Sequence, residues 1–284
     1  MAAWFRSARL SGGIGSHHLR RRFQPNPSKG AHVAVISMHR TTEKFAQASA
    51  VDFARRIVPF WQAALGSEML GAYLIGSLAH GGFSRRYSEV DMALVTEAGV
   101  SAQTLDRVRS EAAALSADWG PKLSVFWTDR QFCLGRFPLL DRIDYIDHAV
   151  ALIEREHVRP VRPTLEEIQR YLAGAPFANW ANLARRFATA ETLEPKDHKA
   201  YLRTLLYPGR FCYSWMTGRM GSNDDAVAFL GKTRPPQLDV NVITRALQCR
   251  RADPDPDFLF PARTTLPSQV DACAALLARM AALS

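Results

Sequence analysis

Apolar residues recur at spacings of three and four from about residue 43, which is the period of a helix with one buried face. The segment is FAQASAVDFARRIVPFWQAAL, in which Phe53, Ile57, Phe60 and Trp61 illustrate the spacing. A Gly-Ser pair then leads into MLGAYLIGS, an apolar run of strand length. The pattern predicts a helix followed by a strand.

Two more strands are predicted further along the chain, at about 90–95 and at 122–128. Both alternate between two faces, and KLSVFWT in the second is rich in residues that favour strands. Between them, TLDRVRSEAAALSADW has a helical period. A strand, a loop, a strand, a helix and a strand together predict a small mixed-sheet domain, which we place at residues 41–158.

After residue 160 the hydrophobic pattern no longer alternates from one residue to the next, so no further strand is predicted. Thr164 and Glu167 have the spacing of a capping box, which predicts that a helix begins there. The predicted helical segments are about 164–173, 178–192, 196–217, 223–230, 239–250 and 266–283. We therefore expect an all-helical domain at 159–284 and an α+β fold class for the whole chain.

The formal net charge of +9 is concentrated at the start of the chain, where residues 1–37 hold six basic residues and no acid. Residues 38–284 therefore carry only +3. The first 40 residues are rich in Gly, Ser, Pro and Arg and lack periodicity, so they are predicted to be disordered. Three interpretations stay open: a basic arm that contacts phosphates, a transit peptide, or an inert extension with Met38 as the true first residue.

Composition narrows the class of protein. No apolar run approaches the roughly 18 residues that span a bilayer, so we expect a soluble protein without a membrane partner. The cysteines lie in apolar surroundings, which is typical of reduced thiols and favours a cytoplasmic location. The four cysteines form no C-x-x-C pair, which predicts reduced thiols rather than a zinc site. The mildly basic body lacks a stretch of interleaved basic and aromatic residues, which argues against a nucleic-acid partner and a nucleic-acid-modifying transferase.

The candidate chemistry lies in GSLAHGGFSRRYSEVDMALV, residues 76–95. Glu89 and Asp91 are two positions apart on the second predicted strand and so project from the same face. Two such carboxylates can share a magnesium ion, which prefers a few carboxylate oxygens together with substrate phosphates. The preceding Gly-Ser turn offers backbone N–H groups and the Ser77 hydroxyl to phosphate oxygens. The stretch therefore predicts displacement at phosphorus on a metal-bound triphosphate.

This stretch resembles the signature of the nucleotidyltransferase (DNA polymerase beta-like) superfamily. Within the superfamily, the chain is most similar to the aminoglycoside 3''-adenylyltransferases. GRFCYSWMTGRMGSNDDAVAFL, residues 209–230, is similar to the helical-domain segment of that family, and the resemblance covers roughly residues 45–280. It implies transfer of AMP from ATP to a hydroxyl of a small molecule, such as an aminoglycoside, in a cleft between the two domains.

The resemblance also implies site residues and cofactors. Magnesium would be held by Glu89 and Asp91, which would be the catalytic carboxylates. ATP would be bound by four residues of the same stretch, namely Gly76, Ser77, Ser88 and Arg85. Arg86 is a further candidate for a phosphate contact, whereas His80 is expected to be a merely exposed loop residue.

Three positions depart from the family pattern. Glu89 stands where the family has an aspartate, and Ser124 stands at the position of its general-base glutamate. Asn223 falls on the phosphate-binding lysine, for which Arg219 or Lys232 could substitute. These departures leave a second hypothesis open, a catalytically impaired nucleotide-binding relative with a regulatory role.

Other acids are candidates for the missing functions. Asp129, at the end of the third predicted strand, is a candidate for the general base, although it lies about five residues beyond Ser124. Asp144 and Asp147 are candidate contacts for a cationic acceptor. Their alternative interpretation is as exposed acids at the start of a helix, where the helix dipole stabilises negative charge.

Overall fold

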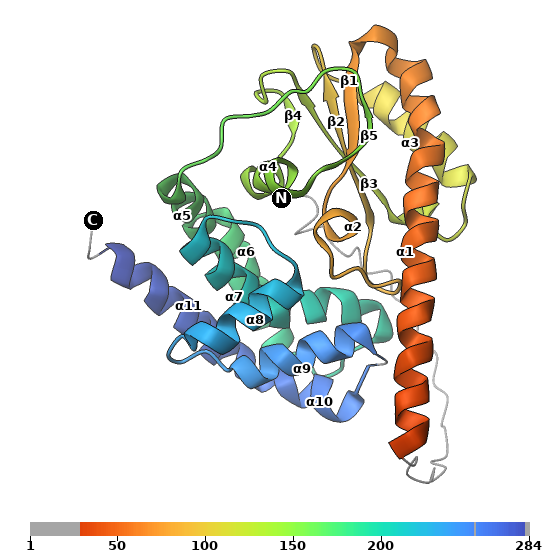
Figure 1. Ribbon diagram of the computed structural model, residues 1–284. Helices are drawn as coiled ribbons and strands as arrows, with labels where there is room; N and C mark the ends of the chain where they lie inside the picture. The colour runs from red at the N-terminus through yellow and green to blue at the C-terminus, as the bar shows by residue number, and fades with distance from the viewer. Residues whose placement is uncertain (1–28, 253, 282–284) are drawn as a thin grey trace.

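The computed structural model describes residues 29–252 and 254–281 (Figure 1). Helix α1 runs from Lys29 to Leu65 along one side of the molecule. Residues 29–40, which were predicted to be disordered, belong to this helix, and no proline interrupts the chain between Gly30 and Val58. Residues 1–28 lie outside the described part. Within the described residues, no helix is both long enough and apolar enough to cross a membrane.

The predicted mixed sheet is confirmed, with five strands in the order β4-β3-β2-β1-β5. Its strands are β1 (Met69–Leu74), β2 (Val90–Thr96), β3 (Leu123–Asp129), β4 (Gly135–Arg136) and β5 (Val150–Glu154). Strands β2 and β3 pair in parallel, and the other pairs are antiparallel. The two edge strands were not predicted, because β4 has only two residues and β5 lacks a buried face that would show as alternation.

Alternation along β2 sends its side chains to two separate cores. Val90, Met92 and Leu94 pack in the cluster that includes Phe53 and Trp61 of α1. This face is also covered by α3 (Ala102–Ala114). The intervening positions, which include Ala93, pack on the opposite face against α4 (Leu139–His148). Asp91 has the parity of this second set and therefore faces α4.

Helix α4 packs against both halves of the molecule. Tyr145 belongs to the core on the sheet, and its hydroxyl donates to the carbonyl of Val158 at 2.8 Å. Leu140 and Ile143 instead belong to the helical core. The same helix also contacts α2 (Ser77–His80) and α5. Helix α4 therefore lies between the sheet and the helical core.

The rest of the chain is helical, as predicted, and the α+β class is confirmed. Its longer helices are α5 (Leu165–Ala173), α6 (Ala175–Ala188), α7 (His198–Thr217), α8 (Asn223–Thr233), α9 (Val240–Arg251), α10 (Pro256–Ala262) and α11 (Leu266–Ala281). The capping box of Thr164 and Glu167 is present at the start of α5. Only α10 was missed, because its prolines predict a break. The domain boundary near residue 158 stays a prediction.

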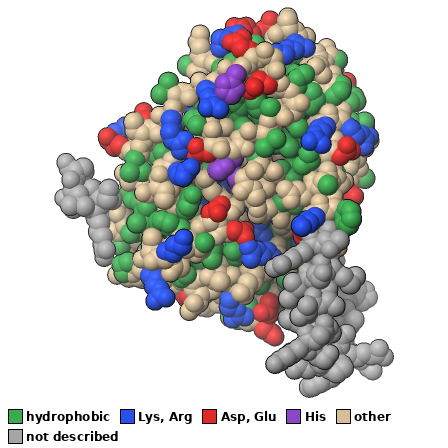
Figure 2. Space-filling model, in the orientation of Figure 1, with side chains coloured by type: hydrophobic (Ala, Val, Ile, Leu, Met, Phe, Trp, Pro, Cys, Tyr) green, Lys and Arg blue, Asp and Glu red, His purple; other side chains and the backbone are tan. Residues whose placement is uncertain are grey.

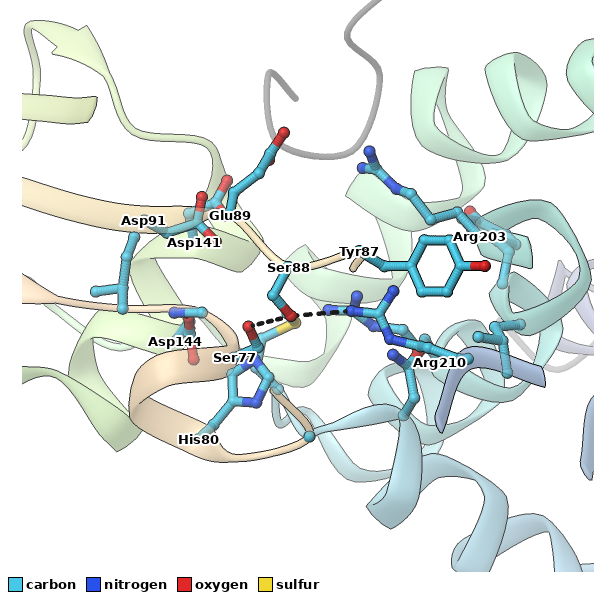
Figure 3. Close-up of a pocket in the computed structure, with 18 of the residues that line it drawn as sticks. Ser77, His80, Tyr87, Ser88, Glu89, Asp91, Asp141, Asp144, Arg203 and Arg210 are labelled. Carbon is cyan, nitrogen blue, oxygen red and sulfur yellow. Dashed lines mark hydrogen bonds between the residues drawn. The ribbon is translucent and has the colours of Figure 1, made fainter. Parts of the chain in front are cut away.

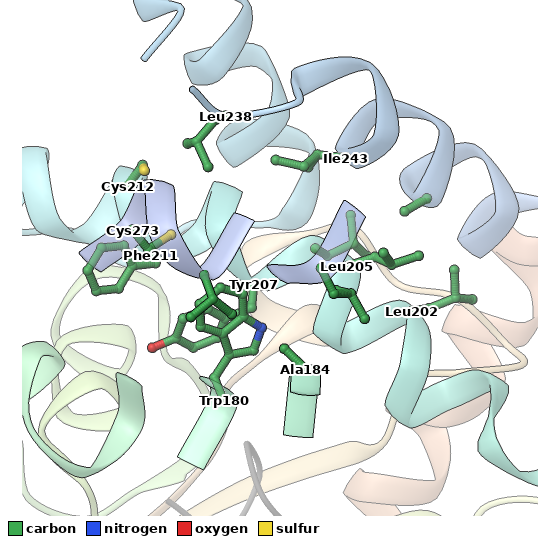
Figure 4. Close-up of a cluster of buried hydrophobic side chains, with 14 of the residues drawn as sticks. Trp180, Ala184, Leu202, Leu205, Tyr207, Phe211, Cys212, Leu238, Ile243 and Cys273 are labelled. Carbon is green, nitrogen blue, oxygen red and sulfur yellow. The ribbon is translucent and has the colours of Figure 1, made fainter. Parts of the chain in front are cut away.

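Helix α7 lies at the centre of the helical core (Figure 4). Its Tyr207 ring stacks on Trp180 of α6, with ring centroids 4.6 Å apart. The four cysteines are free, as expected; Cys133 is exposed, and Cys212, Cys249 and Cys273 are buried. Because one face of α7 is fixed in this core, its opposite face is presented to the sheet.

Candidate active site

A pocket lies between the sheet and the helical core, with about 1040 Å³ of empty space, part of it open to solvent. Its walls come from the loop after β1, from β2 and α4, and from helices α6, α7 and α9 (Figure 3). On the face shown in Figure 2, acidic, basic and histidine side chains gather near the centre, where the sheet-bearing and helical parts meet. Residues far apart in sequence thus share one polar site.

Gly76 and Asp91 are in close contact at the base of the pocket. Gly76 has a φ of 68°, a conformation that side-chain-bearing residues rarely adopt. A Cβ atom at this position would lie 2.6 Å from Oδ2 of Asp91. Glycine is therefore required here both for its conformation and for the space that it leaves to the carboxylate.

The serines predicted to contact phosphates lie together in the pocket. The Ser77 hydroxyl donates to Oγ of Ser88 at 3.0 Å, and Ser88 Oγ also accepts from the backbone N–H of Ser84 at 2.9 Å. Arg250 of α9 donates to the same oxygen at 3.3 Å (Figure 3). Ser88 thus ties the loop after β1 to the helical half of the molecule.

Both predicted metal carboxylates line the pocket. Oε1 of Glu89 accepts from Nζ of Lys199 at 2.8 Å. Asp91 is half-buried, and its Oδ1 is shielded from solvent without a hydrogen-bond partner among the described residues. Loss of solvent, followed by the nearby charge of Glu89, raises the pKa of Asp91 to about 8. Asp91 is therefore a carboxylate whose charged form is disfavoured, with one oxygen that lacks a hydrogen-bond donor among the described residues.

Helix α4 adds two aspartates that face the same space. Asp141 and Asp144 are one turn apart on the helix, with exposed fractions of 6% and 2%. Oδ2 of Asp144 accepts the backbone N–H of Gly76 at 2.6 Å. Burial raises the pKa of Asp141 to about 7, with a further contribution from the charge of Asp144. The interpretation of Asp144 as an exposed acid at a helix start is wrong, because the fold buries it.

Asp147, the other candidate acceptor contact, is directed elsewhere. It lies one turn after Asp144 but pairs with Arg162, whose Nη1 is 2.5 Å from Oδ1 of Asp147. It is not among the residues that line the pocket. Of the expected pair of acids, Asp144 therefore lines the pocket and Asp147 is held by Arg162 outside it.

The helical wall of the pocket is cationic. Lys199, Arg203 and Arg210 share one face of α7, and Arg250 of α9 lies beside them. The guanidinium-bearing residues are half-buried. Burial, and then the positive charge of Arg203, lowers the pKa of both Arg210 and Arg250 to about 10. Such a group of cations favours binding of a polyanion.

The sequence analysis did not single out these four basic residues. Their signal was present as basic positions on one face of an otherwise apolar helix, at spacings of four and seven residues along α7. That signal is weak, because long side chains with this spacing usually lie in solvent. Arg219 and Lys232, the substitutes that we considered, are exposed and do not line the pocket. Asn223 does line it, without a charge.

Arg85 is not brought to the pocket with the other predicted residues. It is exposed, and its backbone N–H donates to Glu43 at 2.8 Å. Together with Arg86 it lines a separate groove beside α1, which also has Arg250 in its wall. Arg85 therefore does not line the pocket that holds Ser77 and Ser88, and its predicted phosphate contact stays a prediction.

His80 is in the pocket, although it was expected to be merely exposed. Its ring packs edge-on against His148, with centroids 5.8 Å apart, and its Nδ1 lies 3.0 Å from the carbonyl of Gly81. Burial lowers the pKa of His80. The neutral ring is therefore the favoured form.

The strand next to β2 offers no carboxylate at the expected position. Ser124 lies directly opposite Asp91 in the parallel register of β2 and β3. Asp129, considered as its replacement, accepts the backbone N–H groups of Cys133 and Leu134 at 2.7 and 2.8 Å. Those bonds hold a turn outside the pocket, so Asp129 does not replace the missing carboxylate.

The donor set fits a magnesium ion that arrives with a nucleotide. Across residues 29–252 and 254–281, no three or more His, Cys, Asp or Glu side chains are placed to hold one metal ion. Magnesium, however, commonly uses one or two carboxylates together with substrate phosphates. The unpartnered Oδ1 of Asp91 and the adjacent Glu89 supply such a pair.

Comparison with known proteins supports the fold. No family model and no curated protein sequence matches this chain. Among solved structures, it is similar to the crystal structure of spectinomycin adenyltransferase AAD(9) from Enterococcus faecialis with ATP and spectinomycin. The TM-score is 0.57 at 11% sequence identity, covering 80% of this chain and 99% of that one. The chain therefore shares the overall fold of that structure, with a small mixed sheet followed by helices.

Proposed function

We propose that this protein transfers AMP from ATP to a hydroxyl group of a small molecule, with magnesium. The observation that carries the proposal is the shared pocket. It joins the Gly76-Ser77 turn and the Glu89-x-Asp91 pair to three guanidinium groups from the helices. A triphosphate and its metal ion would meet complementary charge on both walls.

The basic residues of the pocket would bind the phosphates of ATP, and its acidic residues would bind magnesium. Arg203, Arg210 and Arg250 would bind phosphate oxygens, because a guanidinium donates to them in a fixed planar geometry. Glu89 and Asp91 would hold magnesium, which supplies neutralisation of phosphate charge when it is bound. The acceptor oxygen then forms a bond to the α-phosphorus as the bond to the bridging oxygen breaks and pyrophosphate leaves.

An aminoglycoside is the first acceptor class to test, since the AAD(9) structure was determined with ATP and spectinomycin. Asp144 is the buried acid that supports this choice, because one of its oxygens has no partner among the described residues.

A nucleotide-binding relative with impaired catalysis is the second candidate, and two contacts favour it. Lys199 already neutralises Glu89, and Asp144 already accepts the Gly76 amide that phosphate would otherwise use. Both contacts would have to break before magnesium could use Glu89 or a phosphate oxygen could use the amide of Gly76.

Two measurements separate these candidates. Isothermal titration calorimetry of ATP, with and without magnesium, tests binding in the wild type, in Asp91→Asn and in the matched control Asp147→Asn. Pyrophosphate release with a panel containing spectinomycin, streptomycin and related compounds tests transfer. Binding with acceptor-dependent release supports transfer, binding without release supports the second candidate, and unchanged magnesium-dependent binding in Asp91→Asn contradicts the metal role.

A further inference from the structure

Nucleotidyl transfer needs a group that takes the proton from the acceptor hydroxyl, and β3 does not provide a carboxylate for this step. Ser124 occupies the position opposite Asp91, and a serine hydroxyl does not accept a proton at neutral pH. We infer that Asp141, from helix α4, receives this proton in place of a carboxylate on β3. The inference rests on the proposed function and assigns a catalytic residue to that same site.

The packing of α4 places Asp141 in the right part of the pocket. Tyr145 fixes the helix on the sheet face toward which Asp91 projects, and Leu140 fixes it on the helical core. Asp91 and Asp141 both line the pocket, and the charge of Asp141 contributes to the raised pKa of Asp91 (Figure 3). Asp91 marks the metal-binding end of the site, where the α-phosphate would be attacked.

Asp141 also has the capacity to accept a proton. It is 94% buried, lines the pocket, and its Oδ2 has no hydrogen-bond partner among the described residues. A buried carboxylate oxygen without a donor is costly unless a ligand supplies one. A hydroxyl of the acceptor would be such a donor.

The other acidic or histidine side chains of the pocket already hold a partner or lie on the side away from Asp91. Glu89 holds Lys199, and Asp144 holds the amide of Gly76. His80 lies beneath Ser77 in Figure 3, on the side away from Asp91. No three of the acids in the described part of the chain are placed to hold one metal ion, so Asp141 does not form such a group with Glu89 and Asp91.

The step balances without any further reactant. The oxygen of the acceptor bonds to the α-phosphorus, and its O–H bond breaks as the proton passes to Oδ2 of Asp141. The bond between the α-phosphorus and the bridging oxygen breaks, and its electron pair leaves with pyrophosphate. Asp141 is then returned to the carboxylate form by solvent after product release.

The test compares two aspartates of the same helix. Asp141→Asn should lower pyrophosphate release by about 10² to 10⁴-fold, the usual effect of losing a general base, while magnesium-ATP affinity measured by calorimetry stays within about threefold. Asp147→Asn, which breaks the ion pair with Arg162 outside the pocket, should change neither quantity by more than about threefold.

A second variant separates proton transfer from a structural role. In Asp141→Ala, sodium formate should restore release by about tenfold or more, because a small carboxylate can enter the vacated space. Formate should have no such effect on Asp147→Ala. Thermal unfolding followed by circular dichroism verifies that the variants are folded.

The outcomes distinguish this inference from the proposed function. A wild-type protein that releases no pyrophosphate with any acceptor of the panel overturns the proposed function and this inference with it. A wild-type protein that turns over while Asp141→Asn keeps its rate overturns the inference alone. A rate lost together with ATP affinity, or a loss that formate does not reverse, also overturns it.

Discussion

The ammonium group of Lys199 lies 2.8 Å from a carboxylate oxygen of Glu89, so a cation from α7 contacts the strand that should bind metal. Both side chains are partly exposed, at 36% and 24%, so the pair is screened by solvent. In the absence of nucleotide, Lys199 thus pairs with Oε1 of Glu89, one of the two carboxylate oxygens that magnesium would use.

Lys199→Met should therefore strengthen magnesium binding in the presence of ATP, by up to about fivefold. This limit corresponds to the ~1 kcal/mol that a partly exposed ion pair contributes at most. Calorimetric titration of magnesium into the protein with a non-hydrolysable ATP analogue measures it, with Lys199→Arg as the charge-preserving control. Weaker binding in Lys199→Met would show instead that Lys199 contacts the nucleotide.

Gly76→Ala should destabilise the protein more than Gly81→Ala does. Both glycines have positive φ values, so both substitutions share a conformational cost of about 1–3 kcal/mol. Only at Gly76 would the new Cβ meet a neighbour, Oδ2 of Asp91, whereas at Gly81 it meets nothing within 4 Å. Chemical unfolding compares the two, and equal losses would contradict the contact with Asp91.

Arg250→Met should weaken ATP binding by about 10- to 100-fold, since a hydrogen bond to a charged group contributes about 1.5–3 kcal/mol. The neighbouring Arg251→Met is a matched control, because Arg251 pairs with Asp224 and does not line the pocket. Fluorescence titration with a labelled ATP analogue measures both affinities. Equal effects in the two variants would indicate a general loss of positive charge rather than a specific phosphate contact.

Ser124→Glu should leave the rate of the wild-type protein unchanged or lower it, because Asp141 already accepts the proton. In the Asp141→Asn background, the same substitution should raise pyrophosphate release, because the introduced carboxylate would face the same side of the sheet as Asp91. Rates at saturating ATP compare the four proteins. A gain from Ser124→Glu in the wild-type background would mean that the site lacks a proton acceptor.

The nucleotide-free protein should become less stable as the pH rises from 6 to 8.5. The pKa values of Asp91 and Asp141, about 8 and about 7, lie above the value near 4 of an unfolded aspartate. The folded state therefore holds protons that the unfolded state has lost, so stability falls by up to about 1.4 kcal/mol per pH unit for each such proton.

Urea unfolding with EDTA present measures this slope. The double variant Asp91→Asn/Asp141→Asn should show a flatter profile over the same range. A stability that increases from pH 6 to 8.5 in the wild type, but not in the double variant, would contradict the direction of both shifts.

Much of the fold follows from local patterns in the sequence. The alternation of β2 and β3, the capping box at Thr164 and the period of α7 each appear where they were predicted. The turn at Gly76 and the pair of acids at 89 and 91 were also found in one pocket. These features are readable because each depends on residues close together in the chain.

The sequence by itself therefore determined the class of fold and the strand that carries the acids, because side-chain period and backbone geometry are local properties. Only the tertiary structure decided which other groups complete the site. It buries Asp144 in the pocket but pairs Asp147 with Arg162, places Arg85 in a separate groove, and brings Arg210 and Arg250 to the pocket wall. Those outcomes depend on how α4, α7 and α9 pack on the sheet. Packing brings together residues that are far apart in the chain, and their spacing in the sequence does not show that they will meet.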